Sequence, residues 1–275
     1  MNRAQMRSKL DVMFDKWRAC MANNGSMVIA QNLKQDIFFA GGCIRSMMSG
    51  EKPKDYDIYF TNKETAKLVV QHYLKLVSKY ANISCDIKDT DKGFNVFIQS
   101  EGIAKIDCKK HGYNYEDAPI FISQNAITLA NGIQLVFKTF GQPQSVVDSF
   151  DFTICKNFYQ PSKNIFHLDA SALEHTLTKQ LVYTGSDYPL SSLLRARKYQ
   201  KYGYTISAGD MVKMSYDISK LDLTDVETLK DQLHGVDVAY LNGFISRLTR
   251  EKETNPNFTV SSSYLMEVMD EIYHD

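Results

Sequence analysis

The sequence predicts a head of mixed α and β structure, either α+β or α/β, followed by an all-helical region. Two observations predict the head: short strand-like runs recur up to residue 156, and segments with helical periodicity interrupt them. From about residue 168 the pattern is helical throughout. A chain of 275 residues suits one large or two modest domains. We expect a head over residues 1–167 and a helical domain over residues 168–275.

Local patterns predict the elements of the head in order. Leu10, Met13, Phe14 and Trp17 have the spacing of an amphipathic helix. An apolar strand over residues 37–40 then meets Gly41-Gly42, and a helix follows. The remaining expected elements are an alternating strand over 55–60, a helix over 63–80, and strands over 83–87, 94–99, 103–108, 133–138 and 150–156.

In the helical region, Pro189 is placed to begin a helix and Gly203 to end it. Leu193, Leu194 and Tyr199 are expected to face the core of that region. Further helices are expected over 225–234, 236–250 and 262–273.

Composition excludes several classes of protein. Lys and Arg number 32, as do Asp and Glu, so the chain is neither a strongly basic coat for nucleic acid nor an acidic disordered tail. Charge is uneven: residues 1–160 carry 20 basic against 16 acidic side chains, and residues 161–275 carry 12 against 16. No segment approaches the roughly 18 apolar residues of a membrane helix, and no signal-peptide core is present. The five cysteines are odd in number and scattered. We expect a soluble cytoplasmic protein with reduced cysteines.

Asp55 and Asp57 are the first candidate site residues. Residues two apart on a strand point to the same face, so the two carboxylates project side by side. Their mutual repulsion is relieved by a divalent cation. The alternative is a strand with an exposed acidic face.

A glycine turn lies fifteen residues upstream. Gly41 and Gly42 separate an apolar strand from a helix, where glycine allows a ligand to approach the backbone and free N–H groups attract phosphate. Arg45, one turn further, is placed to reach the same anion. The alternative is an ordinary turn with a surface arginine. Together with the carboxylates, these residues indicate a nucleoside triphosphate with Mg²⁺.

The segment AGGCIRSMMSGEKPKDYDIYF resembles the signature of polymerase-β-superfamily nucleotidyltransferases, in particular the bacterial-type CCA-adding enzymes and poly(A) polymerases. Asp151-Phe152-Thr153-Ile154 resembles that family's RRDFTIN segment, and LLRARKYQKYGY resembles its neck helix. The FDFTICK and YPLSSLLRARKY segments are also similar to bacteriophage-encoded nucleotidyltransferases. The resemblance implies an α+β fold, with a mixed-sheet catalytic head and a helical neck and tail.

The chain also departs from the family pattern. Ser46 stands where the family has Asp, and Ser149-Phe150 replaces an arginine pair. Ser191 or Ser192 stands where a base-reading arginine is expected. The helical tail is short. These departures argue against CCA synthesis itself.

The resemblance implies roles for particular residues. Asp55 and Asp57 are expected to hold Mg²⁺, with Mn²⁺ as an alternative metal, and either Asp107 or Asp151 is expected to be a third catalytic carboxylate. The residues expected to bind the nucleotide are Gly41, Gly42, Arg45, Lys54, Asp151, Arg195 and Lys198.

Arg197 and Lys201 are expected on a solvated face of the neck helix. The six histidines form no spaced cluster and are assigned no role.

The expected function is transfer of a nucleoside monophosphate from an NTP to a hydroxyl, with release of pyrophosphate. An RNA 3′ end, such as that of tRNA, is the first acceptor expected. Two alternatives remain: a protein side chain as acceptor, as in toxin or defence systems, and a binding module with little or no catalysis. A phage-encoded member would act in the host cytoplasm.

Overall fold

The computed structural model describes residues 1–24, 26–90, 93–98, 103–105, 110, 112–113, 115–233, 238–255 and 257–272. The chain divides into two compact units. The sheet unit comprises Met1–Phe150 and Ile154–Thr178, and the helical unit comprises Asp151–Thr153 and Lys179–Asp275. Along the chain, the last change from the sheet unit to the helical unit falls between residues 178 and 179, eleven residues after the boundary expected from the sequence, and residues 151–153 also belong to the helical unit.

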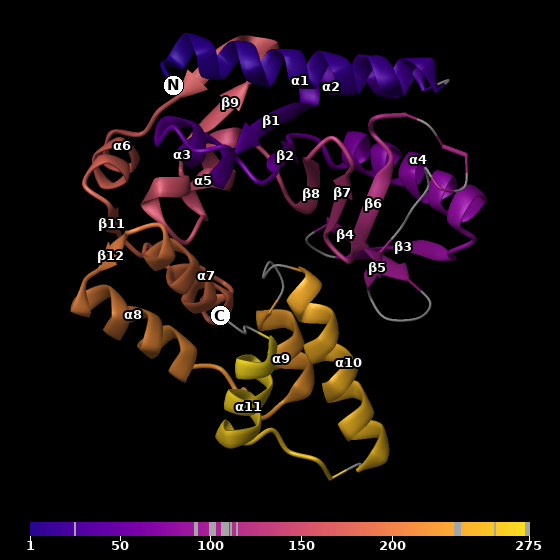
Figure 1. Cartoon of the computed structure of the whole chain (residues 1–275). Coiled ribbons are helices and arrows are strands. Elements are labelled where there is room, and N and C mark those ends of the chain that lie inside the picture. Colours follow the sequence, from indigo (N-terminus) through magenta and orange to yellow (C-terminus); the bar gives the residue numbers. More distant parts are fainter. Residues whose placement is uncertain are drawn as a thin grey trace. The chain divides into compact units, whose positions relative to one another are not determined.

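The sheet unit is built on a mixed eight-stranded sheet (Figure 1). The pairing between its fourth and fifth strands is parallel, and the other pairings described in this sheet are antiparallel. In spatial order the strands are β10 (Ile165–His167), β9 (Phe158–Gln160), β1 (Ile37–Ala40), β2 (Tyr56–Phe60), β8 (Ile133–Phe140), β7 (Ala126–Leu129), β6 (Pro119–Ser123) and β5 (Ile103–Lys105).

A separate antiparallel pair, β3 (Cys85–Thr90) and β4 (Gly93–Ile98), completes the β structure of this unit. The α-helices of the unit are α1 (Arg3–Asn23), α2 (Met27–Asp36), α3 (Gly42–Met48), α4 (Lys63–Ala81), α5 (Pro143–Asp148) and α6 (Ala170–Leu177). The α+β class expected for the head is confirmed.

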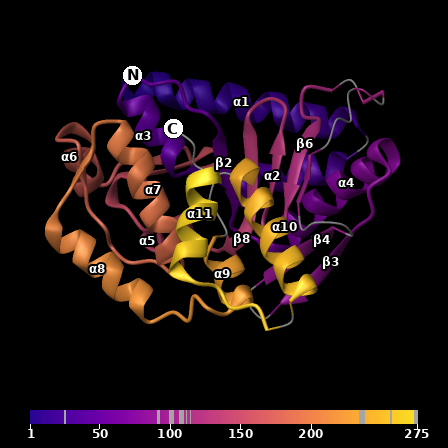
Figure 2. The ribbon, with the colours of Figure 1, turned by 60° about the horizontal axis from the view of Figure 1, so that its bottom comes forward.

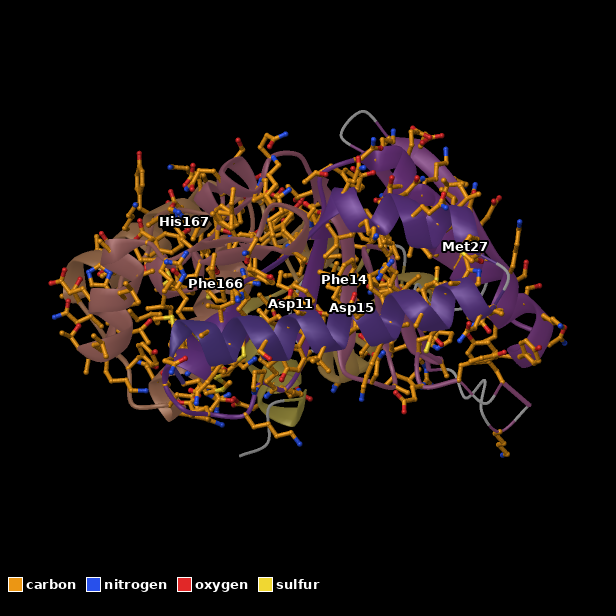
Figure 3. The ribbon with its side chains drawn as sticks, turned by 90° about the horizontal axis from the view of Figure 1, so that it is seen from above. Asp11, Phe14, Asp15, Met27, Phe166 and His167 are labelled. Carbon is orange, nitrogen blue, oxygen red and sulfur yellow. The ribbon has the colours of Figure 1, made fainter. Side chains whose placement is uncertain are left out.

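The first helix, α1, forms as its apolar stripe predicts. Leu10, Phe14 and Trp17 are buried in the main core, whereas Met13 packs at its edge. The helix begins with a reciprocal cap, in which Asn2 and Gln5 each accept a hydrogen bond from the other's backbone N–H. Seen from above, α1 crosses the unit beside the strand that holds Phe166 and His167 (Figure 3). The α2 helix, which the sequence patterns did not predict, follows α1 and packs against it and α4.

Each face of the sheet has its own core. The main core gathers side chains of α1 to α4 with Ile58 and Phe60 of β2. A smaller core on the other face gathers Phe38, Ala40 and Phe158 with two valines of α5. Because side chains alternate along a strand, the residues of β2 that face away from the main core are Asp57 and Tyr59.

The helical unit contains α7 (Pro189–Lys201), α8 (Ala208–Ser219), α9 (Val226–Gln232), α10 (Val238–Thr254) and α11 (Ser262–Ile272) (Figure 2). A short parallel pair, β11 (Gln180–Leu181) and β12 (Thr205–Ile206), accompanies them. Pro189 occupies the first turn of α7, and Gly203, with φ of 82°, follows its end, as expected. Within the described residues, no helix is long and apolar enough to cross a bilayer.

Some expectations were wrong. Residues 150–156 do not form a strand: Thr153–Cys155 is a 3₁₀ turn, and Phe152 makes one isolated bridge to Tyr183. The backbone of this segment bonds residues 182–184 instead, which are distant in sequence. On α7, Tyr199 is buried as expected, but Leu193 is 45% exposed. Strands β6, β7, β9 and β10 and helix α8 had not been predicted.

Candidate functional site

The two carboxylates lie at the start of β2. Asp55 immediately precedes the strand and Asp57 is its second residue, and both are partly exposed, whereas Tyr56 between them is buried. Asp57 is held between two strands, with Gln134 of β8 opposite it in the parallel register. Both carboxylates act electrostatically on the buried Cys43 thiol, so they lie near the same residue of α3.

Gly41 brings the glycine turn against Asp57. It has φ of 82° and ψ of −147°, a conformation that L-residues rarely adopt, and it caps the N-terminus of α3. A Cβ built on Gly41 would lie 3.3 Å from Asp57 Oδ2. The backbone conformation therefore favours glycine here, and a Cβ would crowd the Asp57 carboxylate. Gly42 begins α3 directly after this contact.

Cys43 connects α3 to the same strand. The side chain is buried, and its thiol donates to the carbonyl of Ala40 at 3.5 Å. The backbone N–H of Asp57 also bonds this sulfur. Burial, together with the Asp57 carboxylate, raises the pKa of the Cys43 thiol well above its ordinary value, so the thiol stays neutral. Its role here is to hold the turn and the strand together.

Arg45 lies in a different environment from the one expected. Its guanidinium is buried, and Nη1 donates to Glu51 Oε2 at 2.7 Å. Nη2 donates to Ser46 Oγ at 2.9 Å. Glu51 thus supplies a carboxylate beside the arginine, where Ser46 replaces the Asp of the resembled motif. The pair ties α3 to the loop that leads to Asp55. Lys54, just before Asp55, is exposed.

Asp151 and Arg195 are brought together in the helical unit. Asp151 is 8% exposed, and its Oδ2 accepts from Arg195 Nε at 2.8 Å and lies 2.7 Å from Nη2. The carbonyl of Asp151 accepts from the N–H of Thr184 at 2.8 Å. Arg195 Nη2 also lies 3.5 Å from Ser192 Oγ. Two chain segments that the sequence singled out separately therefore form one ion pair.

The other predicted residues of α7 differ in their surroundings. Lys198 is exposed, as are Arg197 and Lys201, the two expected on a solvated face. Ser191 is fully buried and donates to the carbonyl of Gln232 at 2.5 Å, so its role is to fasten α7 to α9.

Asp107, the other candidate for a third carboxylate, lies outside the described residues. The preceding strand, β5, is at the edge of the sheet, with β8, β7 and β6 between it and β2. Among the described residues, no three His, Cys, Asp or Glu side chains gather as a metal site. Two carboxylates on one face still suit Mg²⁺, which commonly binds one or two protein carboxylates with water and substrate phosphate.

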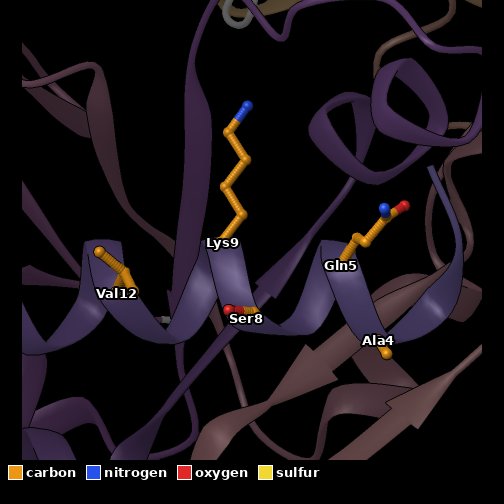
Figure 4. A pocket seen from close by; sticks show the side chains of 5 residues that line it. All are labelled: Ala4, Gln5, Ser8, Lys9 and Val12. Atoms are coloured by element: carbon orange, nitrogen blue, oxygen red, sulfur yellow. The ribbon is translucent and has the colours of Figure 1, made fainter.

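A surface hollow elsewhere on the sheet unit lacks this chemistry. It lies along α1 and is made of exposed side chains of that helix alone (Figure 4). Lys9 Nζ lies 5.6 Å from the ring centre of Tyr56, which faces away from Asp55 and Asp57. The hollow is therefore on the opposite side of β2 from the carboxylates. Its lining residues are Ala4, Gln5, Ser8, Lys9 and Val12.

Sequence reasoning missed three contributors on the sheet unit: Cys43, Glu51 and Tyr59. Cys43 and Glu51 carried no motif signal, because their importance comes from contacts with Asp57 and Arg45. Tyr59 could have been found, since it lies two residues beyond Asp57 and shares its face. Phe150 was noted in the sequence only as a departure from an arginine pair.

The chain is an α+β protein with paired carboxylates beside a glycine turn, and solved structures similar to it are CCA-adding enzymes. The Thermotoga maritima CCA-adding enzyme complexed with tRNA is 12% identical with a TM-score of 0.43, over 86% of this chain and 52% of the enzyme. An apo CCA-adding enzyme is 14% identical with a TM-score of 0.46, over 93% of this chain and 55% of the enzyme. The chain spans about half the length of these enzymes.

The sequence comparison is more specific. A family model described as Gabija anti-defense 2 family protein matches residues 8–179, which is more than half of the chain. The chain therefore belongs to the Gabija anti-defense 2 family. A relative named Gabija anti-defense 2, from Bacillus phage SPbetaL7, is 24% identical over 214 residues. The match covers 77% of this chain and 44% of that relative, so it spans less than half of the relative's length.

Proposed function

We propose that the protein is a Mg²⁺-dependent nucleotidyltransferase that serves an anti-defense role. The observation that carries the proposal is the nearness of Asp55 and Asp57, at the start of β2, to the glycine turn: both carboxylates act on the Cys43 thiol, and a Cβ on Gly41 would lie 3.3 Å from Asp57 Oδ2. The acidic pair would hold Mg²⁺, and the glycine turn beside it would lie near the phosphates of the NTP.

The proposed reaction moves a nucleoside monophosphate to a hydroxyl. The acceptor oxygen bonds to the α-phosphorus and loses its proton, and the bond from the α-phosphorus to the bridging oxygen of pyrophosphate breaks. Bound Mg²⁺ would neutralise the developing phosphate charge. Asp55 and Asp57 would hold that ion, with Mn²⁺ as a substitute, and the backbone at Gly41 and Gly42 would approach the phosphates.

The remaining residues take supporting roles in this proposal. Lys54 is exposed beside Asp55 and would contact phosphate. Arg45, paired with Glu51, fixes the loop before Asp55 and has this positioning role in place of direct phosphate contact. Asp151 and Arg195 would contact the nucleotide as a preformed pair. Lys198, exposed on α7, would contact the acceptor.

Two acceptors are compatible with this chemistry. The motif resemblance favours an RNA 3′ end. The family description and the phage relative favour a component of a bacterial defence system, and thus a hydroxyl-bearing protein side chain, as the acceptor. The phage relative also supports action in the host cytoplasm.

Mg²⁺-dependent binding of NTP tests the proposal before any acceptor is known. Wild-type protein is expected to bind at least one of the four NTPs with Mg²⁺ and to lose that binding in EDTA. Asp57→Ala is expected to abolish the Mg²⁺ dependence. Asp86→Ala, which removes an exposed carboxylate from β3, is the matched control and should bind as wild type does. Equal Mg²⁺-dependent binding by wild type and Asp57→Ala would contradict the proposal.

A further inference from the structure

Two aromatic side chains lie beside the carboxylate pair in the sheet unit. Tyr59 shares the face of β2 that carries Asp57 and is partly exposed. Phe150, also partly exposed, has its ring centre 5.5 Å from that of Tyr59, with an angle of 44° between the rings. Phe150 Cε2 lies 3.9 Å from the point that a Cβ of Gly41 would occupy, and Asp57 Oδ2 lies 3.3 Å from the same point. The ring edge and the carboxylate therefore flank one small space.

Both rings also pack against the smaller core, where Phe38 is the residue of β1 opposite Tyr59 and covers one face of its ring. Tyr59 stacks on the fully buried Phe38, with ring centres 5.5 Å apart and an angle of 19°. Phe38 in turn packs edge-on against Phe158 in the smaller core. The N–H of Phe150 donates to the carbonyl of Val147 at 3.1 Å, so its backbone is fixed by the end of α5. Little conformational entropy is left for these rings to lose when a ligand binds.

We propose that Tyr59 and Phe150 form a stacking subsite for a nucleobase next to Asp57. This inference rests on the proposed function, which brings a nucleotide phosphate to Asp55 and Asp57. A base joined to that phosphate needs a surface beside the carboxylates, and aromatic rings provide one for any base through its π-face. Phe150 stands where the resembled motif has an arginine, so charge recognition at this position is replaced by stacking.

The tryptophan fluorescence of a Phe150→Trp variant reports ligand binding at the subsite directly. Trp17, the single native tryptophan, is fully buried in the main core and gives a constant background. The Phe150→Trp emission is expected to be quenched on titration with NTP and Mg²⁺, or with a short single-stranded RNA. Phe97→Trp is the matched control, because Phe97 is 41% exposed on β4 in the separate two-stranded sheet. Its emission should not respond.

Two substitutions of Phe150 distinguish stacking on a base from general apolar packing. Phe150→Leu keeps an apolar side chain and is expected to weaken binding of the responding nucleotide by about 5- to 150-fold, whereas Phe150→Trp should bind as tightly as wild type. Thermal denaturation of each variant shows that it is folded. Wild-type affinity in Phe150→Leu would overturn the subsite.

The quenching experiment identifies the source of the base, and a separate transfer assay tests the proposed function. Quenching by NTP assigns the subsite to the incoming nucleotide, and quenching by RNA alone assigns it to the acceptor end. If wild type transfers nucleotide but Phe150→Trp responds to neither ligand, the subsite is wrong and the function stands. If Phe150→Trp responds but no transfer occurs with any acceptor, the subsite stands and the function is wrong.

Discussion

Gly41 is the residue at which local conformation and the site depend most directly on each other. Replacement by alanine forces a Cβ to within 3.3 Å of Asp57 Oδ2 and strains a backbone with φ of 82°. We expect Gly41→Ala to cost about 1–2 kcal/mol in the free energy of unfolding and to reduce NTP binding at least tenfold. Chemical denaturation and NTP titration measure the two effects.

Gly203→Ala is the control for backbone strain alone. Gly203 also has φ of 82°, but a Cβ there would meet nothing within 4 Å. A similar loss of stability with unchanged NTP binding is expected. Equal NTP binding by both alanine variants would mean that Gly41 has no special relation to the site.

Glu51 is expected to be important for stability because its partner, Arg45, is buried. Glu51→Gln keeps the size of the side chain but removes the charge opposite the guanidinium. About 1–3 kcal/mol of unfolding free energy should be lost, a value below that of a fully buried pair because Glu51 is 32% exposed. Asp89→Asn, which breaks a surface pair with Lys63 and Lys67, should have little effect. An unchanged midpoint for Glu51→Gln in urea would contradict the assignment.

At the scale of elements, patterns that depend on neighbours in sequence predicted structure well. The strand at 37–40, the glycine turn and the alternation of β2 all follow from short-range rules, and with them came the placement of Asp55 and Asp57. Residues 150–156 have the composition of a strand, yet their backbone bonds residues 182–184. The sequence near residues 150–156 does not indicate that their backbone partner is residues 182–184. The same reason explains why the Asp151–Arg195 pair, whose partners are 44 residues apart, was not predicted.

The start of α2 is coupled to α4 through a histidine. Ser26 Oγ lies 2.8 Å from His72 Nδ1, and His72 Nε2 is buried. Burial, with a contribution from Lys75, lowers the pKa of His72 below its ordinary 6.5. The folded state therefore favours the neutral ring, so this contribution to stability is present above pH 6.5 and is lost as the pH falls through the folded-state pKa.

We therefore expect wild-type unfolding free energy to fall between pH 7.5 and pH 5.5 by more than that of His72→Gln. Urea denaturation at both pH values gives the two differences. Identical pH dependence in the two proteins would show that His72 does not contribute.

At the scale of the whole molecule, the candidate residues are divided between two units. The carboxylate pair, the glycine turn and the aromatic rings belong to the sheet unit, whereas the Asp151–Arg195 pair belongs to the helical unit. The chain enters the helical unit briefly at Asp151–Thr153 and returns to the sheet unit at Ile154. The sequence identified residues in both units through motifs but placed the boundary eleven residues early, because helix α6 looks like the start of the helical region while packing with the sheet unit.

Label transfer tests the central claim most directly. Wild type and an Asp55→Ala/Asp57→Ala variant are each incubated with Mg²⁺, a mixture of RNA and cell protein, and each NTP labelled at the α- or the γ-phosphate. The account predicts that α-label, but not γ-label, enters RNA or protein with wild type and not with the variant; the labelled fraction identifies the acceptor. Absence of transfer with wild type, or equal transfer by the variant, would contradict the account.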